Sequence, residues 1–466
     1  MLRWVFSACE ILIHLIPIPS RGADLSCDLD GMLERIGVKT AAELFSDVPE
    51  KVRVEGVSLP DGMDERAVME HVGRLMGKNL SADKAPCFMG AGVYDHYAPA
   101  ALRSIVGRSE FITAYTPYQP EISQGMLQSL FEYQCLMTEL TGMDVVNDTM
   151  YDGATALAEA ALMSSRITGK DEFAVPASLH PDYLSVLQNY LDGPGMRIVQ
   201  YDFDPMTGQA SPASIEKSVG ENTAGIFMQS PNGFGVLEEL LPEAREIAGK
   251  AALVVGVNPM ALSLLRPPAD FGADIVVGDV QPFGLGMNYG GPGAGLFAAR
   301  REHVRKMPGR LVGMTADSNG RRAFCLTLST REQHIRRSKA TSNICSNQAL
   351  MAVASAAYVA LLGRTGLRRV AEQSLENAHA LKDELAGAKD LRVPLFKGSF
   401  FNELSIGLPL DAREVNKRLA RKNVIGGSPI DVKPYGLGDA MMLACTERSD
   451  AHARKALVEA LRGVLA

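Results

Sequence analysis

Aromatic residues and long basic runs are scarce in this 466-residue sequence. Aromatic side chains make up 6% of the chain, a single tryptophan is present, and the formal net charge is −7. The densest basic stretch, from Arg331 to Lys339, is short and contains Glu332. Because no long run of lysine and arginine is available to neutralise phosphates, nucleic-acid binding is excluded as the main function.

Paired cysteines and long apolar runs are also lacking. The seven cysteines are scattered and none forms a CxxC pair, which argues against a zinc site or a disulfide framework and favours a reducing compartment. We find no stretch of about 18 uncharged apolar residues, the length that a membrane-spanning helix needs. The sequence therefore predicts a cytoplasmic protein with no metal centre and no membrane span.

The amino-terminal part differs from the rest of the chain. Residues 1–30 contain an early basic residue, Arg3, followed by an apolar run, as a signal peptide does. Glu10 and His14 interrupt that run. We expect an atypical extension there rather than a secretion signal. Residues 31–75 have apolar side chains at helical spacing, with prolines between the helical segments, which predicts a helical arm.

Strands and helices alternate through most of the chain, where 46% hydrophobic residues suffice for a large core. Short apolar runs that predict strands are FAVPAS, RIVQYDF, AGIFMQS, ALVVGV, DIVVGDV and AGLFAAR. Helical segments lie between several of them, so we expect βαβ crossovers, a mostly parallel sheet and a large α/β domain over residues 76–330. Residues 331–466 predict a connecting helix and a smaller α+β domain, with strands at LRVPLF and FNELSI.

Two glycine-containing loops lie where a parallel sheet holds its ligands, beyond the carboxyl ends of strands. The loop YDGATA opens a helix, and its backbone N–H groups either bind an anion or form a plain turn and cap. The loop GDVQPFGLGMNYGGPGAG follows a predicted strand. Neither loop contains the GxxxxGK[ST] or GxGxxG pattern, so nucleotide binding is not indicated.

The segment from Phe88 to Gln124 is rich in glycine, proline and tyrosine. A braced loop with so many hydrogen-bonding groups is either one wall of a functional cleft or a crossover at a subunit interface. The candidate site residues in this segment are Tyr94, His96, Tyr97, Tyr115, Tyr118, Gln119, Glu121 and Gln124.

Six blocks resemble the glycine cleavage system P-protein, glycine dehydrogenase (decarboxylating), and in particular its subunit 1, the amino-terminal half in organisms that split the enzyme. The blocks are MGAGVYDHYAPA, YTPYQPEISQG, YDGATALAEAALM, QSPNGFGVLEE, NYGGPGAGLFAAR and TREQHIRRSKATSNICSNQAL. The blocks stand in the order that the family has them and the resemblance covers roughly residues 31–450, which makes it far more specific than one short motif. Residues 1–30 lack it.

The resemblance implies an aspartate-aminotransferase-like fold of the pyridoxal-phosphate (PLP) type I class. It also implies an α2β2 assembly with a subunit 2. Together the subunits would decarboxylate glycine and pass the aminomethyl group to the lipoyl arm of the H-protein. The eight candidate residues would then line or brace the partner's active-site entrance. His96 would serve as a structural group or assist proton transfer, two roles that the sequence leaves open.

PLP chemistry needs a lysine that holds the cofactor as a Schiff base. In this fold the lysine follows a strand and precedes a glycine-rich loop, but no lysine lies between Arg266 and Arg300. The stretch ALVVGVNPMAL also lacks the acid expected to face the pyridine nitrogen. We therefore expect no catalytic residue in this chain and covalent binding of PLP by the partner, as the resemblance implies.

Two alternatives stay open. Lys339 lies among Arg336, Arg337 and His334, whose positive charges would lower the pKa of its amine, so it is the best rival for a Schiff-base lysine. A chain that used it would be a self-sufficient PLP-dependent decarboxylase or lyase. The other alternative is a scaffold subunit that binds a partner without contributing to catalysis.

Overall fold

The computed structural model describes residues 25–54 and 58–465, and the chain divides into one unit that ends at Asn79 and another that begins at Leu80. The first unit contains the helices α2 (Leu25–Ile36) and α3 (Glu65–Met76). The Asp64 side chain caps α3 by accepting a hydrogen bond from the Ala67 N–H at 2.7 Å. Most of the extension predicted over residues 1–30 lies outside the described residues, and the predicted domain boundaries after residues 75 and 330 stay predictions.

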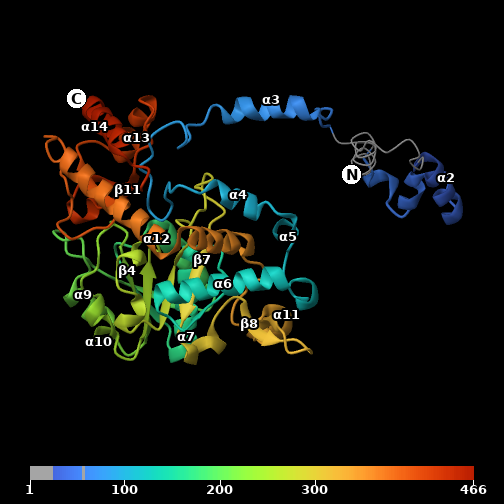
Figure 1. Cartoon of the computed structure of the whole chain (residues 1–466), viewed down its shortest axis with the longest axis horizontal. Coiled ribbons are helices and arrows are strands. Elements are labelled where there is room, and N and C mark those ends of the chain that lie inside the picture. The colour runs from blue at the N-terminus through green and yellow to red at the C-terminus, as the bar shows by residue number, and fades with distance from the viewer. Residues whose placement is uncertain (1–24, 55–57, 466) are drawn as a thin grey trace. The chain divides into compact units, whose positions relative to one another are not determined.

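A seven-stranded sheet forms the centre of the second unit, in the order β1-β7-β6-β5-β4-β2-β3 (Figure 1). The strands β6, β5, β4, β2 and β3 run parallel to one another, whereas β7 runs antiparallel to both of its neighbours, β6 and β1. Their bounds are β1 Val145–Val146, β2 Glu172–Pro176, β3 Arg197–Tyr201, β4 Thr223–Ser230, β5 Ala252–Val257, β6 Ile275–Asp279 and β7 Gly295–Ala299. The predicted α/β class and mostly parallel sheet are confirmed.

Helices cover both faces of this sheet, which explains the continuous apolar strands. Along β5, Leu253 and Val255 belong to a core shared with α6 and α12, whereas Val254 belongs to a second core shared with α7 and α8. Because successive side chains of a strand point to opposite faces, both sets are buried. The helices before α12 are α4 Ala100–Val106, α5 Ser109–Ile112, α6 Gln124–Thr141, α7 Gly153–Thr168, α8 Pro181–Asp192, α9 Pro212–Ser218, α10 Ala244–Ala248 and α11 Gln333–Arg336.

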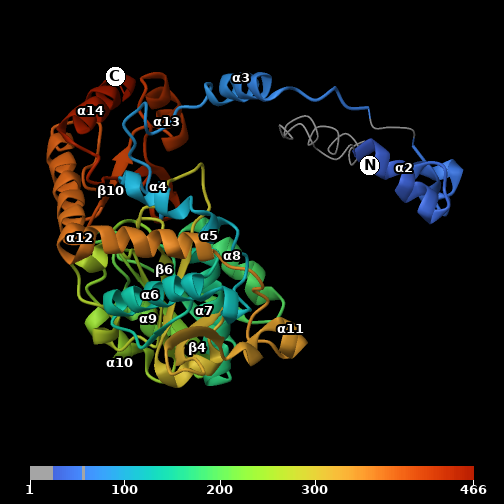
Figure 2. The same cartoon turned by 45° about the vertical axis from the view of Figure 1, so that its right-hand side comes forward.

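The long helix α12 (Ala349–Leu385) joins the sheet region to the carboxyl-terminal region. Gly363 has φ 61° and ψ −177°, a conformation that only glycine adopts readily, and it separates the two halves of the helix seen in Figure 2. Among the described residues, α12 alone is long and apolar enough by composition to span a membrane. Its residues Ala352, Val353 and Ala371 are buried in the core of the second unit, as expected of a core helix.

The carboxyl-terminal region is a small α+β layer. It contains an antiparallel sheet in the order β10-β12-β11, with helices α13 and α14, and a separate hairpin, β8-β9, precedes it in the chain. The predicted strand LRVPLF forms only an isolated bridge between Arg392 and Gly407, because Pro394 cannot donate a ladder hydrogen bond. The bounds are β8 Leu311–Ala316, β9 Arg322–Thr327, β10 Glu403–Leu408, α13 Ala412–Arg421, β11 Ser428–Asp431, β12 Asp439–Ala444 and α14 Ala451–Leu465.

Candidate functional site

A cavity of about 60 Å³ lies at the carboxyl ends of the parallel strands. His180, Asn232, Asn258 and Asp279, which follow or end β2, β4, β5 and β6, lie in its lining. This is the edge at which parallel α/β sheets hold ligands. A water molecule needs about 10–15 Å³ of such space, so the cavity has room for a few water molecules.

Asp279 fills the part of the cavity beside the start of α7. One carboxylate oxygen accepts a hydrogen bond from the Gly153 N–H at 3.1 Å, and the other accepts from Gln281 at 2.9 Å and Ala294 at 3.3 Å. Burial raises the pKa of Asp279 to about 6, against the opposing effect of these N–H donors. The chain's own carboxylate therefore occupies the amino terminus of α7.

The YDGATA loop forms a helix cap in this structure. The Asp152 side chain accepts a hydrogen bond from the Thr155 N–H at 2.8 Å, and the Thr155 hydroxyl accepts one from the Asp152 N–H at 3.1 Å. This reciprocal pair is a capping box. With Gly153 bonded to Asp279, the first N–H groups of the helix are engaged by side chains of the same chain.

Glu403 and Tyr94 form the opposite wall. Glu403 is buried, accepts a hydrogen bond from the Ala91 N–H at 2.7 Å, and has its pKa raised to about 7 by burial. Burial also raises the pKa of Tyr94, whose backbone N–H donates to Gln281 Oε1 at 2.9 Å. The Phe88–Gln124 segment thus contributes to the cavity through its first residues.

Two buried polar atoms that border the cavity have no hydrogen-bond partner among the described residues. They are Gln229 Oε1, near the end of β4, and Asn258 Nδ2, directly after β5. Both residues belong to the cavity lining, together with Asp279 and Glu403, but the two unpaired atoms themselves are fully buried.

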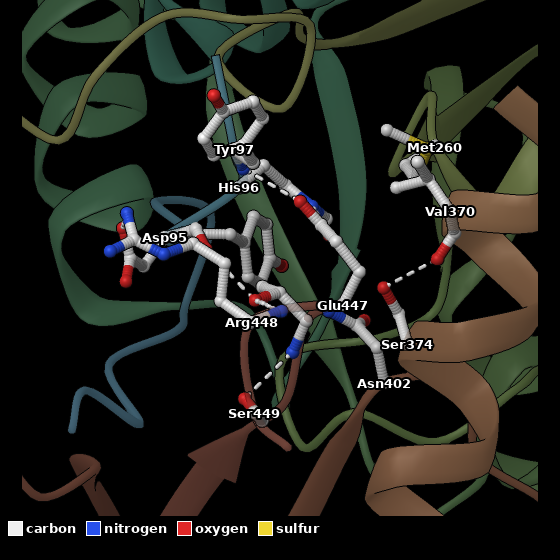
Figure 3. Close-up of polar contacts among 12 residues, drawn as sticks. Asp95, His96, Tyr97, Met260, Val370, Ser374, Asn402, Glu447, Arg448 and Ser449 are labelled. Atoms are coloured by element: carbon white, nitrogen blue, oxygen red, sulfur yellow. Dashed lines mark hydrogen bonds and ion pairs between the residues drawn. The ribbon is translucent and has the colours of Figure 1, made fainter. Parts of the chain in front are cut away.

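His96 is not part of the cavity lining and instead contacts Glu447 in the carboxyl-terminal region (Figure 3). Its Nδ1 lies 2.7 Å from a Glu447 oxygen, and the Tyr97 N–H donates to the other oxygen at 2.6 Å. Burial raises the pKa of Glu447, but the hydrogen bond and charge of His96 outweigh it, so the net pKa is lowered. Asp95 and Arg448 form an ion pair at 2.9 Å beside this contact. His96 Nε2 is buried and has no hydrogen-bond partner within residues 25–54 and 58–465.

A second polar cluster surrounds Arg310, which is 6% exposed. The guanidinium donates to the Tyr118 hydroxyl at 3.0 Å and to the Cys345 carbonyl, and it lies 3.4 Å from Glu332. The Tyr118 hydroxyl in turn donates to Glu332 at 3.1 Å. Arg310 thereby joins the loop that holds Tyr118 to the segment that follows β9. Nearby, Tyr115 shares a 2.6 Å hydrogen bond with Ser346.

The eight predicted residues therefore do not form one site. Tyr94 lines the cavity, whereas His96 and Tyr97 contact Glu447. Tyr115 and Tyr118 contact the segment after β9. Gln119 and Glu121 are exposed, and the Gln124 amide is bonded to the Phe324 backbone. The rival lysine, Lys339, is exposed in a short 3₁₀ turn and is not part of the cavity lining.

Sequence reasoning did not single out several residues that organise these places, namely Asn258, Asp279, Arg310, Glu403 and Glu447. Asn258 and Asp279 were within reach, because polar residues at the carboxyl ends of predicted parallel strands converge on one edge of the sheet. The remaining three act through residues that are distant in sequence, and no local pattern indicates them.

The second unit has the architecture of PLP-dependent enzymes of fold type I. The structure is similar to that of sphingosine-1-phosphate lyase from Burkholderia pseudomallei, with a TM-score of 0.65 over 90% of this chain and 94% of the other. At 15% identity this likeness shows the fold alone. It confirms the fold expected from the sequence.

Closer relatives identify the family. The family model for the glycine cleavage system P-protein matches residues 23–461, and the chain belongs to this family. A probable glycine dehydrogenase (decarboxylating) subunit 1 from Carboxydothermus hydrogenoformans is 47% identical, over 93% of this chain and 97% of that protein. The crystal structure of an inhibitor-bound glycine decarboxylase (P-protein) of the glycine cleavage system is 40% identical, with a TM-score of 0.88 over 97% of this chain and all of the other.

Proposed function

We propose that this chain is subunit 1 of a heteromeric glycine dehydrogenase (decarboxylating) of the cytoplasmic glycine cleavage system. Its partner, subunit 2, binds PLP covalently, and the two assemble as an α2β2 heterotetramer. The complete enzyme removes CO2 from glycine and transfers the aminomethyl group to the lipoyl arm of the H-protein. The names of the relatives support the activity and a second subunit.

One observation carries the assignment of PLP to the partner. The cavity at the carboxyl ends of the strands contains no lysine among its lining residues, and the sequence has none between Arg266 and Arg300. Without an amine at that place, the chain has no nucleophile for a Schiff base beside the loop that follows β6. The proposed cytoplasmic location agrees with the five cysteines of the described residues, all of which are free.

We assign the predicted loop residues to the partner's active-site entrance. Tyr97, Tyr115 and Tyr118 expose 61%, 78% and 47% of their surface, and Gln119 and Glu121 are exposed beside them in sequence, so these five have surface available to a partner. Buried Tyr94 and His96 and half-buried Gln124 brace the loop from within. Aromatic groups with a polar tip are common at such interfaces.

Co-expression with subunit 2 tests the assembly and the activity together. We expect the two chains to co-elute at the size of a heterotetramer, and the complex, supplied with lipoylated H-protein, to decarboxylate glycine. Neither chain alone should do so. Turnover by subunit 2 alone would leave this chain a scaffold. A borohydride-reducible absorption band on this chain with PLP, in the absence of a partner, would instead indicate a self-sufficient enzyme that uses Lys339 or another lysine.

Substitution of His96 separates bracing from proton transfer. His96→Ala removes the contact with Glu447 and is expected to lower glycine–bicarbonate exchange by the assembled enzyme about tenfold, the effect of one hydrogen bond to a charged group. His96→Asn places an amide near the Nδ1 position but has no Nε2, so exchange should stay within about threefold of wild type if His96 only braces the loop.

The two variants give a clear alternative. Equal losses in His96→Ala and His96→Asn would assign the activity to Nε2 and favour proton transfer. Unchanged exchange in both would refute a role of His96 at the entrance. Tyr435→Phe, a change on a partly buried tyrosine of the carboxyl-terminal region, serves as the control.

A further inference from the structure

The cavity of this chain is the counterpart of a fold type I coenzyme site, because it lies at the carboxyl ends of the parallel strands and borders the loop after β6. A site that holds PLP provides a lysine, an acid or other partner for the ring nitrogen, and N–H groups for the phosphate. The absent lysine excludes only covalent attachment. Whether the site accepts PLP without a covalent bond depends on the other groups.

The phosphate position is already filled. The N–H groups of Gly153, Gln281 and Ala294 converge on the Asp279 carboxylate at 2.9–3.3 Å. A phosphate dianion placed there would have to displace a buried carboxylate or lie against its like charge.

Tyr183 leaves little space beside Gly153, at the amino terminus of α7. A Cβ atom added to Gly153 would collide with the Tyr183 hydroxyl, so the ring already lies against the first turn of α7. At this end of α7 the Gly153 N–H donates to Asp279 and the Thr155 N–H donates to Asp152, so both are engaged by carboxylates of the chain itself.

The ring position lacks the acid that this fold expects. Asn258 follows β5 in its place, and its amide can donate a hydrogen bond to a pyridine nitrogen but cannot protonate it. The residues present therefore do not fit PLP.

We infer that Asp279 is a built-in replacement for the phosphate group, and that its carboxylate, with Tyr183, closes this chain's coenzyme pocket to PLP in free and covalent form alike. The inference rests on the proposed function and deepens it, since it explains why each pair of subunits would hold one coenzyme.

Ligand binding by the full-length chain tests the inference. In calorimetric titrations the wild-type chain is expected to bind neither PLP nor inorganic phosphate. Asp279→Ala exposes the three N–H donors and should lower the dissociation constant for inorganic phosphate at least about tenfold. Asp279→Asn keeps an acceptor in place and should bind no phosphate.

Asp411→Ala is a matched control. Asp411 caps α13 by accepting hydrogen bonds from the N–H groups of Arg413 and Glu414, and it lies outside the cavity. If any uncapped helix bound phosphate, Asp411→Ala would gain affinity as Asp279→Ala does, and the special role of Asp279 would be refuted. A lack of phosphate binding by folded Asp279→Ala would refute it as well.

Binding of PLP by the wild-type chain at one molecule per chain would overturn the inference, and that measurement needs no variant to fold. Failure of the proposed function looks different, because the complex with subunit 2 would then lack glycine decarboxylation whatever this chain binds. A coenzyme content of one PLP per pair of subunits in an active complex, with none on the separated chain, supports both.

Discussion

Replacement of Arg310 by alanine is expected to lower the free energy of unfolding by about 3–5 kcal/mol, the usual cost of removing one partner from a buried ion pair. The Arg310 side chain is only 6% exposed, and its guanidinium contacts Tyr118, Glu332 and the Cys345 carbonyl. Its removal leaves the Glu332 carboxylate, 11% exposed, without its buried cationic partner. Urea unfolding of the purified chain measures the change.

The same variant is expected to affect the assembled enzyme. Arg310 lies under the Tyr118 ring, with 5.2 Å between the guanidinium carbon and the ring centroid, and so fixes the loop assigned to the partner's entrance. We expect glycine–bicarbonate exchange to fall at least about tenfold in Arg310→Ala and by a similar factor in Tyr118→Phe, which loses the hydroxyl shared by Arg310 and Glu332. Normal exchange in Tyr118→Phe would contradict the role of this tyrosine.

Two further variants define the cause. Arg310→Lys keeps the charge but not the planar fork that serves several acceptors at once, so it should lie between wild type and alanine. Arg266→Ala is the control, because Arg266 also lies over an aromatic ring and near a carboxylate but has a side chain 68% exposed. Its loss is expected to cost under about 1 kcal/mol. Equal destabilisation by Arg266→Ala and Arg310→Ala would show that burial is not the cause.

The fold was largely predictable because its signals are local. The six apolar runs predicted as strands correspond to β2 to β7, since strands covered on both faces are written as continuous apolar segments. Gly142, at φ 69°, ends α6 in the left-handed conformation that favours glycine. The hairpin β8-β9 was missed, because the burial of its residues does not alternate along either strand.

The site was less predictable because its contacts are non-local. The loop was chosen for its density of polar groups, yet His96 depends on Glu447 and Tyr118 on Arg310, more than 190 positions away in sequence. Local composition indicates that a loop is polar but not what it bonds to. The absence of a lysine after β6 was readable from the sequence. The hydrogen bond from the first residue of α7, Gly153, to Asp279 at the end of β6 was visible only in the three-dimensional structure.

Glu403→Gln is expected to change how stability depends on pH. Burial raises the pKa of Glu403 from 4.5 to about 7, so the folded chain holds the proton of the Glu403 carboxyl group more tightly than the unfolded chain does. The stabilising contribution is therefore fully present below pH 4.5 and is lost as the pH rises through about 7. A difference of this size corresponds to roughly 3 kcal/mol at 1.36 kcal/mol per pKa unit.

Urea unfolding of both chains at pH 5, 6, 7 and 8 measures this contribution. Glutamine keeps an acceptor for the Ala91 N–H but does not ionise, and buried acids such as Asp148 and Asp279 are common to both chains, so the difference between the two curves isolates Glu403. Wild type should lose stability relative to Glu403→Gln as the pH rises from 5 to 8. Glu121→Gln, on an exposed side chain, is the control and should follow the wild-type curve. A difference that stays constant or grows in favour of wild type would mean that Glu403 is ionised in the folded chain, and the wall that it forms with Tyr94 would then carry a full negative charge.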